Sequence, residues 1–178
     1  MSILIKNGRV IDPANNIDDI LDVLIEDTRI SRISQDIRAE VDEIVDAAGK
    51  IVMPGIVDMH VHLREPGRED KETVLTGTQA ALKGGVTSVL AMPNTQPPID
   101  CVENVRLLKS IIKKTARANV FIAATITKGR KGAEITDIPQ LKKEGVVAIT
   151  DDGSSVDSEE LFLKTLKKAK QYRILVMC

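Results

Sequence analysis

After Pro54 the sequence alternates short apolar runs with longer amphipathic stretches, and this alternation restricts the possible folds more than any other feature. A strand that alternates with a helix in this way favours parallel βαβ units, in which the helix crosses back over the sheet. The predicted class is therefore α/β. The expected strands cover residues 55–61, 86–92, 120–126, 146–150 and 173–177, and the expected helices cover 72–83, 102–112, 139–144 and 157–170.

The predicted helices carry recognisable start and stop signals. Gly84 and Gly85 suit a left-handed C-terminal cap for the first helix. Asp100 precedes Glu103 by three residues, which is the spacing of a capping box. The same spacing separates Asp157 from Glu160, so these aspartates are expected to cap the second and the last helix.

Residues 1–53 differ in character and are predicted to form a separate small antiparallel β module, with residues 54–178 as the second domain. Short β-prone pieces are separated by turn signals at residues 7–8, 12–13, 15–16 and 27–28. The acidic residues of this module are interpreted as a solvated face without a further role. They include Asp36, Glu40, Asp42, Glu43 and Asp46.

The two histidines of the chain, His60 and His62, end the first apolar run after Pro54. Alternate residues of a strand share a face, so Asp58 and both imidazoles point the same way, with the rings about 6–7 Å apart along the backbone. Neutral imidazole is a common metal ligand. The alternative is a packed, hydrogen-bonded pair of core histidines. Arg64 lies two residues after His62 and is suited to bidentate capture of a carboxylate, so the pattern favours a metal site for an anionic substrate.

Two further strand ends carry polar groups. Asn94 follows the second strand, where its amide could bind a polar ligand or simply start the turn before Pro97. Asp151 and Asp152 follow the fourth strand and precede Gly153. Adjacent strand residues point to opposite faces, so at most one of these carboxylates can face the histidines. An acidic pair before a glycine is also an ordinary loop start.

Composition excludes several classes of function. The chain has 178 residues with 43% hydrophobic content, enough for one domain or one domain with a small appendage. A net charge of −1 and an aromatic content of 2% argue against nucleic-acid binding. Cys101 and Cys178 form no motif, which fits a reducing compartment. No apolar stretch is long enough for a signal h-region or a membrane span, so a cytoplasmic location without membrane partners is expected.

Three segments together resemble a known family. Pro54–Gly67, Met92–Thr95 and Thr150–Gly153 are similar to the type I dihydroorotases of the amidohydrolase superfamily. The resemblance extends from the N-terminal module to Cys178. It implies a TIM-type (β/α)₈ barrel of the amidohydrolase kind, incomplete here with about five strands, and a small N-terminal β-sandwich module.

The resemblance also implies roles for individual residues. His60 and His62 would bind Zn²⁺, and Asp152 would be the strand-four ligand that can bridge to a second ion, giving one or two zinc ions. Arg64 and Asn94 would hold the substrate, N-carbamoyl-L-aspartate or L-dihydroorotate. His62 and Leu63 belong to the same substrate-binding segment. The expected reaction is the reversible opening and closing of a cyclic amide in pyrimidine biosynthesis.

The chain departs from the family pattern in length, because a complete barrel takes about 250 residues. The family's third and fourth site histidines and its catalytic aspartate, the general acid and base, are expected beyond residue 178. The fragment alone is therefore expected to turn over little or no substrate. A homodimer or a complex with aspartate transcarbamoylase is also an expectation of the resemblance.

Two other functions stay open at this point. One is a hydantoinase-like or allantoinase-like cyclic amidohydrolase, in which a lysine would be expected at the position of Asp152. The other is a non-catalytic dihydroorotase-like partner of aspartate transcarbamoylase, which would be expected to lose His60 or His62.

Overall fold

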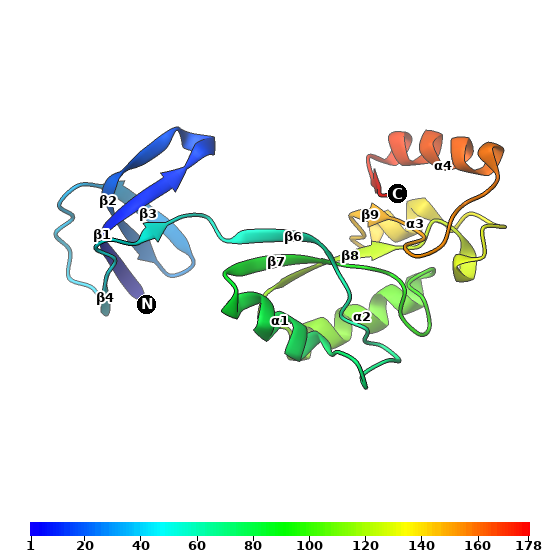
Figure 1. Ribbon diagram of the computed structural model, residues 1–178, viewed down its shortest axis with the longest axis horizontal. Coiled ribbons are helices and arrows are strands. Elements are labelled where there is room, and N and C mark those ends of the chain that lie inside the picture. The colour runs from blue at the N-terminus through cyan, green and yellow to red at the C-terminus, as the bar shows by residue number, and fades with distance from the viewer. The chain divides into compact units, whose positions relative to one another are not determined.

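The computed structural model describes residues 1–178, which form two compact units, Met1–Pro54 and Gly55–Cys178. The first unit is one mixed β-sheet (Figure 1). In it, the first three strands pair antiparallel in sequence order, and the last two pair parallel with the first strand. The strands are β1 (Ser2–Asp12), β2 (Ile17–Glu26), β3 (Arg29–Ser34), β4 (Glu43–Asp46) and β5 (Ile51–Val52), and the 3₁₀ turn η1 (Pro13–Asn15) joins β1 to β2.

The prediction of an antiparallel module is therefore right for β1 to β3 and wrong for β4 and β5, and one sheet is present where a sandwich would have two. The reason lies in residues 35–42, which form no strand and return the chain to the beginning of β1. From there β4 runs alongside Ile3–Lys6 and β5 runs alongside Arg9 and Val10, both in the direction of β1.

The predicted turn at residues 7–8 is instead an irregularity within one long strand. The pairing of β1 with β2 shifts register between Ile5 and Gly8, and Asn7 adopts a left-handed φ of 63°. A left-handed residue inside a strand produces a bulge that bends the strand without ending it. A Cβ on Gly8 would lie 2.5 Å from Cγ2 of Val52, so the glycine also allows β5 to approach.

A buried carboxylate holds this bulge. Asp22 is 4% exposed and accepts hydrogen bonds from the main-chain N–H groups of Asn7 (2.9 Å) and Ile37 (3.0 Å). The five acidic residues predicted to form a solvated face are exposed. Two of them also accept hydrogen bonds that lower the pKa of their carboxyl groups. Asp42 accepts from the main chain and the hydroxyl of Ser2, and Asp46 accepts from Ala48 N and from the Asn7 amide.

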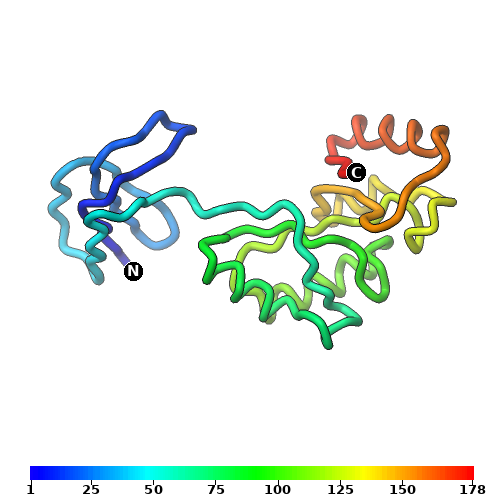
Figure 2. Tube along the Cα trace, in the orientation of Figure 1, coloured from blue at the N-terminus to red at the C-terminus, as the bar shows by residue number.

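The second unit is an α/β structure with one parallel sheet, as predicted (Figure 1). Its five strands lie in the order of the sequence, each beside the next, and helices occupy the connections between them, as the trace in Figure 2 shows. The strands are β6 (Ile56–Val61), β7 (Val86–Ala91), β8 (Asn119–Ala124), β9 (Ala148–Ile149) and β10 (Leu175–Val176). The helical segments are α1 (Val74–Lys83), α2 (Val102–Thr115), η2 (Lys128–Arg130), α3 (Ile138–Lys143) and α4 (Glu159–Tyr172).

Both faces of the parallel sheet carry buried apolar side chains. Because side chains alternate along a strand, these side chains form two separate clusters. Ala91, Ile122 and Ile149 belong to the larger core, which also contains residues of the helices such as Val105 and Leu141. Residues directly before or after them in the sequence belong to a smaller cluster. It contains Leu90, Met92, Ala123 and Ala148, with Val147 and Met177 packed against it. Neighbouring residues thus supply opposite faces of the sheet.

Helix ends were predicted less well than helices. Gly85 adopts the expected left-handed φ of 81° after α1. The predicted capping box at Asp100 is wrong, because the N-cap of α2 is Cys101 and no side chain caps the helix. Asp100 instead accepts hydrogen bonds from Gly129 N at 2.8 Å and from the side-chain amide of Asn104 at 3.2 Å. Ser158, one residue after the predicted cap, caps α4 by accepting from Leu161 N at 3.2 Å.

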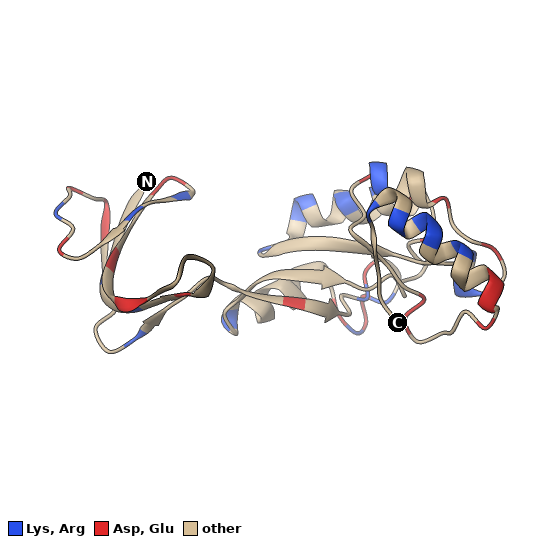
Figure 3. Cartoon of the chain, turned by 90° about the horizontal axis from the view of Figure 1, so that it is seen from above, with Lys and Arg blue, Asp and Glu red and all other residues tan.

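Helix α4 has acidic residues in its first turn and lysines along its length, as Figure 3 shows near the C-terminus. Glu159 and Glu160 lie at the positive end of the helix dipole and Lys170 at the negative end, an arrangement that stabilises an exposed helix. None of the helices combines the length and the apolarity that crossing a bilayer requires.

The loops after β6 and β7 approach each other closely at Gly67. Its φ is 95°, and a Cβ built on it would lie 1.9 Å from the main-chain oxygen of Gln96. Gln96 also donates a main-chain hydrogen bond of 2.9 Å to the carbonyl of Pro66. A residue without a side chain is therefore required where these two loops meet.

We expect Gly67→Ala to lower the free energy of unfolding by about 3–5 kcal/mol, because backbone strain and overpacking add at this position. Gly145→Ala is the matched control. Gly145 has a φ of 88° but no atom within 4 Å of a built Cβ, so it should lose only about 1–2 kcal/mol. Urea denaturation measures both values, and equal losses would contradict the close approach at Gly67.

Candidate metal centre

Three predicted ligands meet at the carboxyl edge of the parallel sheet. His60 lies near the end of β6, His62 follows it, and Asp152 lies three residues after β9. One ligand atom from each residue lies within 4.8 Å of the other two. The side chains are 50%, 31% and 18% exposed, respectively, so the group is open to solvent on one side. Parallel pairing produces this meeting, because it brings the ends of β6 and β9 to one edge.

Each imidazole nitrogen lies as far from one carboxylate oxygen as two ligands of the same metal ion lie from each other. His60 Nε2 lies 3.4 Å from Asp152 Oδ1, and His62 Nε2 lies 3.6 Å from Asp152 Oδ2. With metal–ligand bonds of 2.0–2.2 Å, the edge of a tetrahedron is about 3.3–3.6 Å long. The two imidazole rings lie edge to face with centroids 5.2 Å apart, so they do not stack against each other. Imidazole nitrogen and carboxylate oxygen are the donors that zinc and similar ions take.

Asn94 joins two of these ligands. Its Oδ1 lies 2.9 Å from His62 Nδ1, and its Nδ2 donates a 2.8 Å hydrogen bond to Asp152 Oδ2. An amide oxygen can only accept, so Nδ1 is the donor in this pair and Nε2 is the nitrogen left to face Asp152 and a metal ion. From the sequence, Asn94 was expected either to bind a polar substrate or to start a turn. In the structure it also orients two of the predicted metal ligands.

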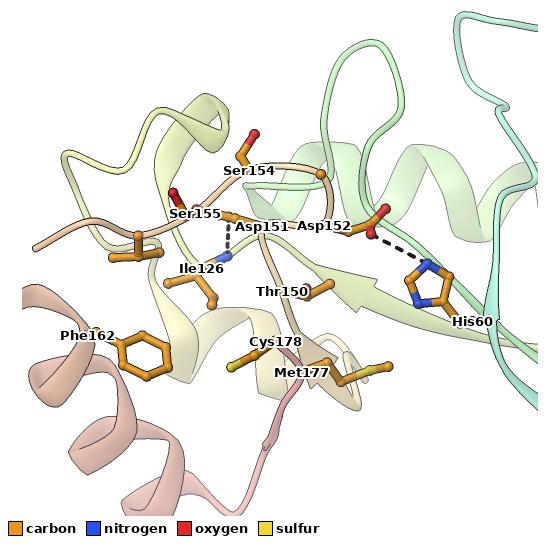
Figure 4. A pocket seen from close by; sticks show the side chains of 12 residues that line it. His60, Ile126, Thr150, Asp151, Asp152, Ser154, Ser155, Phe162, Met177 and Cys178 are labelled. Atoms are coloured by element: carbon orange, nitrogen blue, oxygen red, sulfur yellow. Dashed lines mark hydrogen bonds and ion pairs between the residues drawn. The ribbon is translucent and has the colours of Figure 1, made fainter. Parts of the chain in front are cut away.

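The aspartate pair divides as strand alternation predicts. Asp152 faces the histidines, whereas Asp151 is 3% exposed and accepts hydrogen bonds from the main-chain N–H groups of Ile126 (2.8 Å) and Thr127 (3.0 Å) and from the Thr127 hydroxyl. Figure 4 shows the two carboxylates pointing apart, one toward His60 and the other toward Ile126. Asp151 thus fixes the loop after β8 against the loop that carries Asp152.

The residues of the predicted substrate-binding segment 62–64 have different surroundings in the structure. The Leu63 side chain is 4% exposed and packs in the larger core, where its Cδ2 lies 2.6 Å from the place of a Cβ on Gly77. The apolar side chain therefore faces α1. Arg64 has a left-handed φ of 61° and lines a cavity together with Asn94.

A larger cavity of about 420 Å³ opens beside His60 and Asp152 (Figure 4). Thr150, Phe162 and Met177 line it as well. Its lining is mostly apolar with the candidate ligands at one side, a composition suited to a small organic molecule held next to a metal ion.

Sequence reasoning missed Arg130, which donates from Nη2 to the main-chain oxygen of Asp152 and, at 3.3 Å, to Ser154 Oγ. Arg130 lies in η2, after β8, in a stretch with several basic residues. Nothing in its local sequence distinguishes it from solvated neighbours such as Lys128 and Lys131. Its left-handed φ of 58° and its position at the strand ends appear only in the folded chain.

The fold of the chain is similar to part of the hydantoinase fold. L-Hydantoinase (dihydropyrimidinase) from Arthrobacter aurescens superimposes with a TM-score of 0.85 at 20% sequence identity, over 98% of this chain and 39% of the hydantoinase. At that identity the likeness concerns the fold alone.

Sequence comparison identifies the family. A family model described as dihydro-orotase-like matches residues 49–177, so the chain belongs to the dihydroorotase-like family. The dihydroorotase of Elusimicrobium minutum is 48% identical over 177 residues, which is 99% of this chain and 41% of that protein. The dihydroorotase of Geotalea daltonii is 46% identical over 178 residues, 99% of this chain and 42% of that protein. The chain thus spans about two fifths of the length of these curated relatives.

We expect Asn94→Ala to weaken binding of Zn²⁺ about 10- to 100-fold, because His62 and Asp152 lose the amide that orients them. Competition with a chromogenic chelator measures the affinity. Asn119→Ala is the control, since the Asn119 amide bonds Thr87 O at the opposite end of the sheet. Equal affinities for both variants would contradict an orienting role for Asn94.

We expect Asp151→Ala to lower the free energy of unfolding by about 3–5 kcal/mol, because three buried donors lose their acceptor. Asp151→Asn is the matched control, since its amide oxygen can still accept from the two main-chain N–H groups, and it should lose less than half as much. Denaturant titration checks both variants. A loss below about 1 kcal/mol for Asp151→Ala would mean that the carboxylate does not hold the two loops together.

Proposed function

We propose that this chain supplies the first part of the active site of a zinc-dependent cyclic amidohydrolase that interconverts N-carbamoyl-L-aspartate and L-dihydroorotate. The observation that carries the proposal is the meeting of His60, His62 and Asp152 at the edge of a parallel sheet, in a chain of the dihydroorotase-like family. The sheet would then be the first five strands of a (β/α)₈ barrel, with residues 54–178 as barrel and residues 1–53 as a separate module.

The proposed metal is Zn²⁺, as one or two ions held by His60, His62 and Asp152. Support comes from the donor types and from the spacing of 3.4 and 3.6 Å between imidazole nitrogen and carboxylate oxygen. When bound, zinc polarises a carbonyl group and lowers the pKa of a coordinated water to about 7.

The remaining residues would bind and orient the substrate. Arg64 carries a charged fork that matches a carboxylate, and it would neutralise and orient the acidic group of dihydroorotate. Asn94 would hold His62 and Asp152 in place from one side while its amide borders the substrate. Such positioning lowers the entropic cost of bringing the scissile amide to the metal centre. The homodimer and the complex with aspartate transcarbamoylase stay predictions of the resemblance.

Hydantoinase-like activity is the competing assignment, and the aspartate at position 152 argues against it. The resemblance leads us to expect lysine at this position in hydantoinases and allantoinases, whereas the carboxylate of Asp152 is already placed between both imidazoles. Dihydroorotate also carries an acidic group that hydantoin lacks, and Arg64 offers it a partner. A panel of dihydroorotate, hydantoin, dihydrouracil and allantoin separates these functions, and preferential opening of a neutral ring would refute the dihydroorotase assignment.

In a protein that carries this chain together with the remaining strands of the barrel, we expect Asp152→Ala to lower kcat/KM for dihydroorotate opening by about 100-fold or more. The bound zinc should fall as well, because one of the proposed ligands is lost. The measurement pairs an absorbance assay of ring opening with elemental analysis of the purified protein. Asp36→Asn serves as control, because Asp36 is exposed and lies in the other compact unit. Full activity and full zinc content in Asp152→Ala would rule out the proposed role.

A further inference from the structure

A second cavity, of about 280 Å³, borders the candidate metal centre and is lined by basic side chains. Arg64 and Arg68 and Lys71 come from the loop after β6, and Arg130 comes from η2 after β8. Asn94 also lines this cavity, and it is the residue that bonds His62 and Asp152. No acidic side chain is part of the lining. We call this the basic cavity.

The charges of the basic cavity are not balanced. Arg68 is paired, because its Nε and Nη2 donate to the two carboxylate oxygens of Asp70 at 3.1 and 3.4 Å, and this pairing lowers the pKa of Asp70. The side chains of Arg64 and Lys71 make no ion pair and no hydrogen bond. Three of the four cations therefore lack an anionic partner.

Arg130 is held in a fixed position by some of its N–H donors, while others have no partner. Its Nη2 binds the main-chain oxygen of Asp152 and Ser154 Oγ, while its Nε is buried without a hydrogen-bond partner. A buried donor without a partner is costly, and a bound ion is one of the groups that can satisfy it. Because Arg130 touches Asp152 and Asn94 touches both Asp152 and His62, an anion in the basic cavity would lie directly beside the metal centre.

We infer that Lys71 and Arg130 bind the substrate carboxylate together with Arg64, and so select anionic over neutral cyclic amides. This inference rests on the proposed function. The planar guanidinium of Arg130 can contact a carboxylate while Nη2 keeps its protein partners, and Lys71 adds a mobile positive charge at the exposed side of the cavity. One carboxylate group surrounded by three cations would be neutralised and held at a defined distance from the metal ligands.

The test compares Lys71→Gln and Arg130→Gln with Arg68→Gln in a purified, zinc-loaded protein of full family length, in which this chain is joined to the remaining strands of the barrel. The first two remove unbalanced charges, whereas the third removes a charge that Asp70 already compensates. We expect Lys71→Gln and Arg130→Gln each to raise KM for dihydroorotate about 5- to 10-fold, with kcat within about twofold, and Arg68→Gln to change neither by more than about twofold. The first two variants should also weaken binding of succinate, measured by calorimetry, by a similar factor.

Lys71→Gln keeps the test decisive if Arg130→Gln folds poorly, because the Lys71 side chain holds no other part of the chain. The inference is overturned if Lys71→Gln behaves like Arg68→Gln, or if all three variants weaken binding equally, which would indicate a general charge effect. Weakened succinate binding in a protein that opens no dihydroorotate would support the anion site and refute the proposed reaction. Normal turnover with unchanged KM in Lys71→Gln and Arg130→Gln would support the proposed reaction and refute the anion site.

Discussion

Parallel pairing of β6 to β10 is the constraint on which the candidate site depends. Parallel strands joined by helices present all their carboxyl ends at one edge of the sheet. Main-chain hydrogen bonds align these ends, from Met92 N to Val61 O and from Thr150 N to Ala124 O. The residues that follow the strands are thereby brought together, although His62 and Asp152 are 90 positions apart in the chain.

The rigidity of the site comes from contacts between the loops at this edge. Asp151 accepts three hydrogen bonds from the loop after β8, and Arg130 returns one from that loop to the carbonyl of Asp152. Gly67 allows the loop after β6 to lie against Gln96. The contacts of Asp151 are buried and that of Arg130 is partly buried, so they limit the number of positions that Asp152 can adopt. A metal ion would therefore bind to a group that is already largely arranged.

Most of the second unit could be predicted from periodicity, because apolar strands and amphipathic helices leave local patterns in the sequence. The divergence at helix ends has a tertiary cause: Asp100 has the local features of a cap but binds Gly129, which is distant in the sequence. In the first unit, the parallel pairing of β4 and β5 with β1 could not be predicted, because turn signals report where strands end and not which strand the chain returns to. Lys71 and Arg130 were missed because a basic residue on a loop looks the same in sequence whether it is solvated or lines a cavity.

The sequence by itself determined the chemical inventory and its local order. It specified two imidazoles on one side of a strand, a single carboxylate able to face them, and an arginine next to the second imidazole, because side-chain direction in a strand follows from a period of two. The tertiary structure decided which atoms meet. It placed Asn94 between His62 and Asp152, buried Asp151 against another loop, and gathered unpaired cations around one cavity. These outcomes depend on strand order and loop packing, which arise from contacts between residues far apart in the chain and therefore have no local signature.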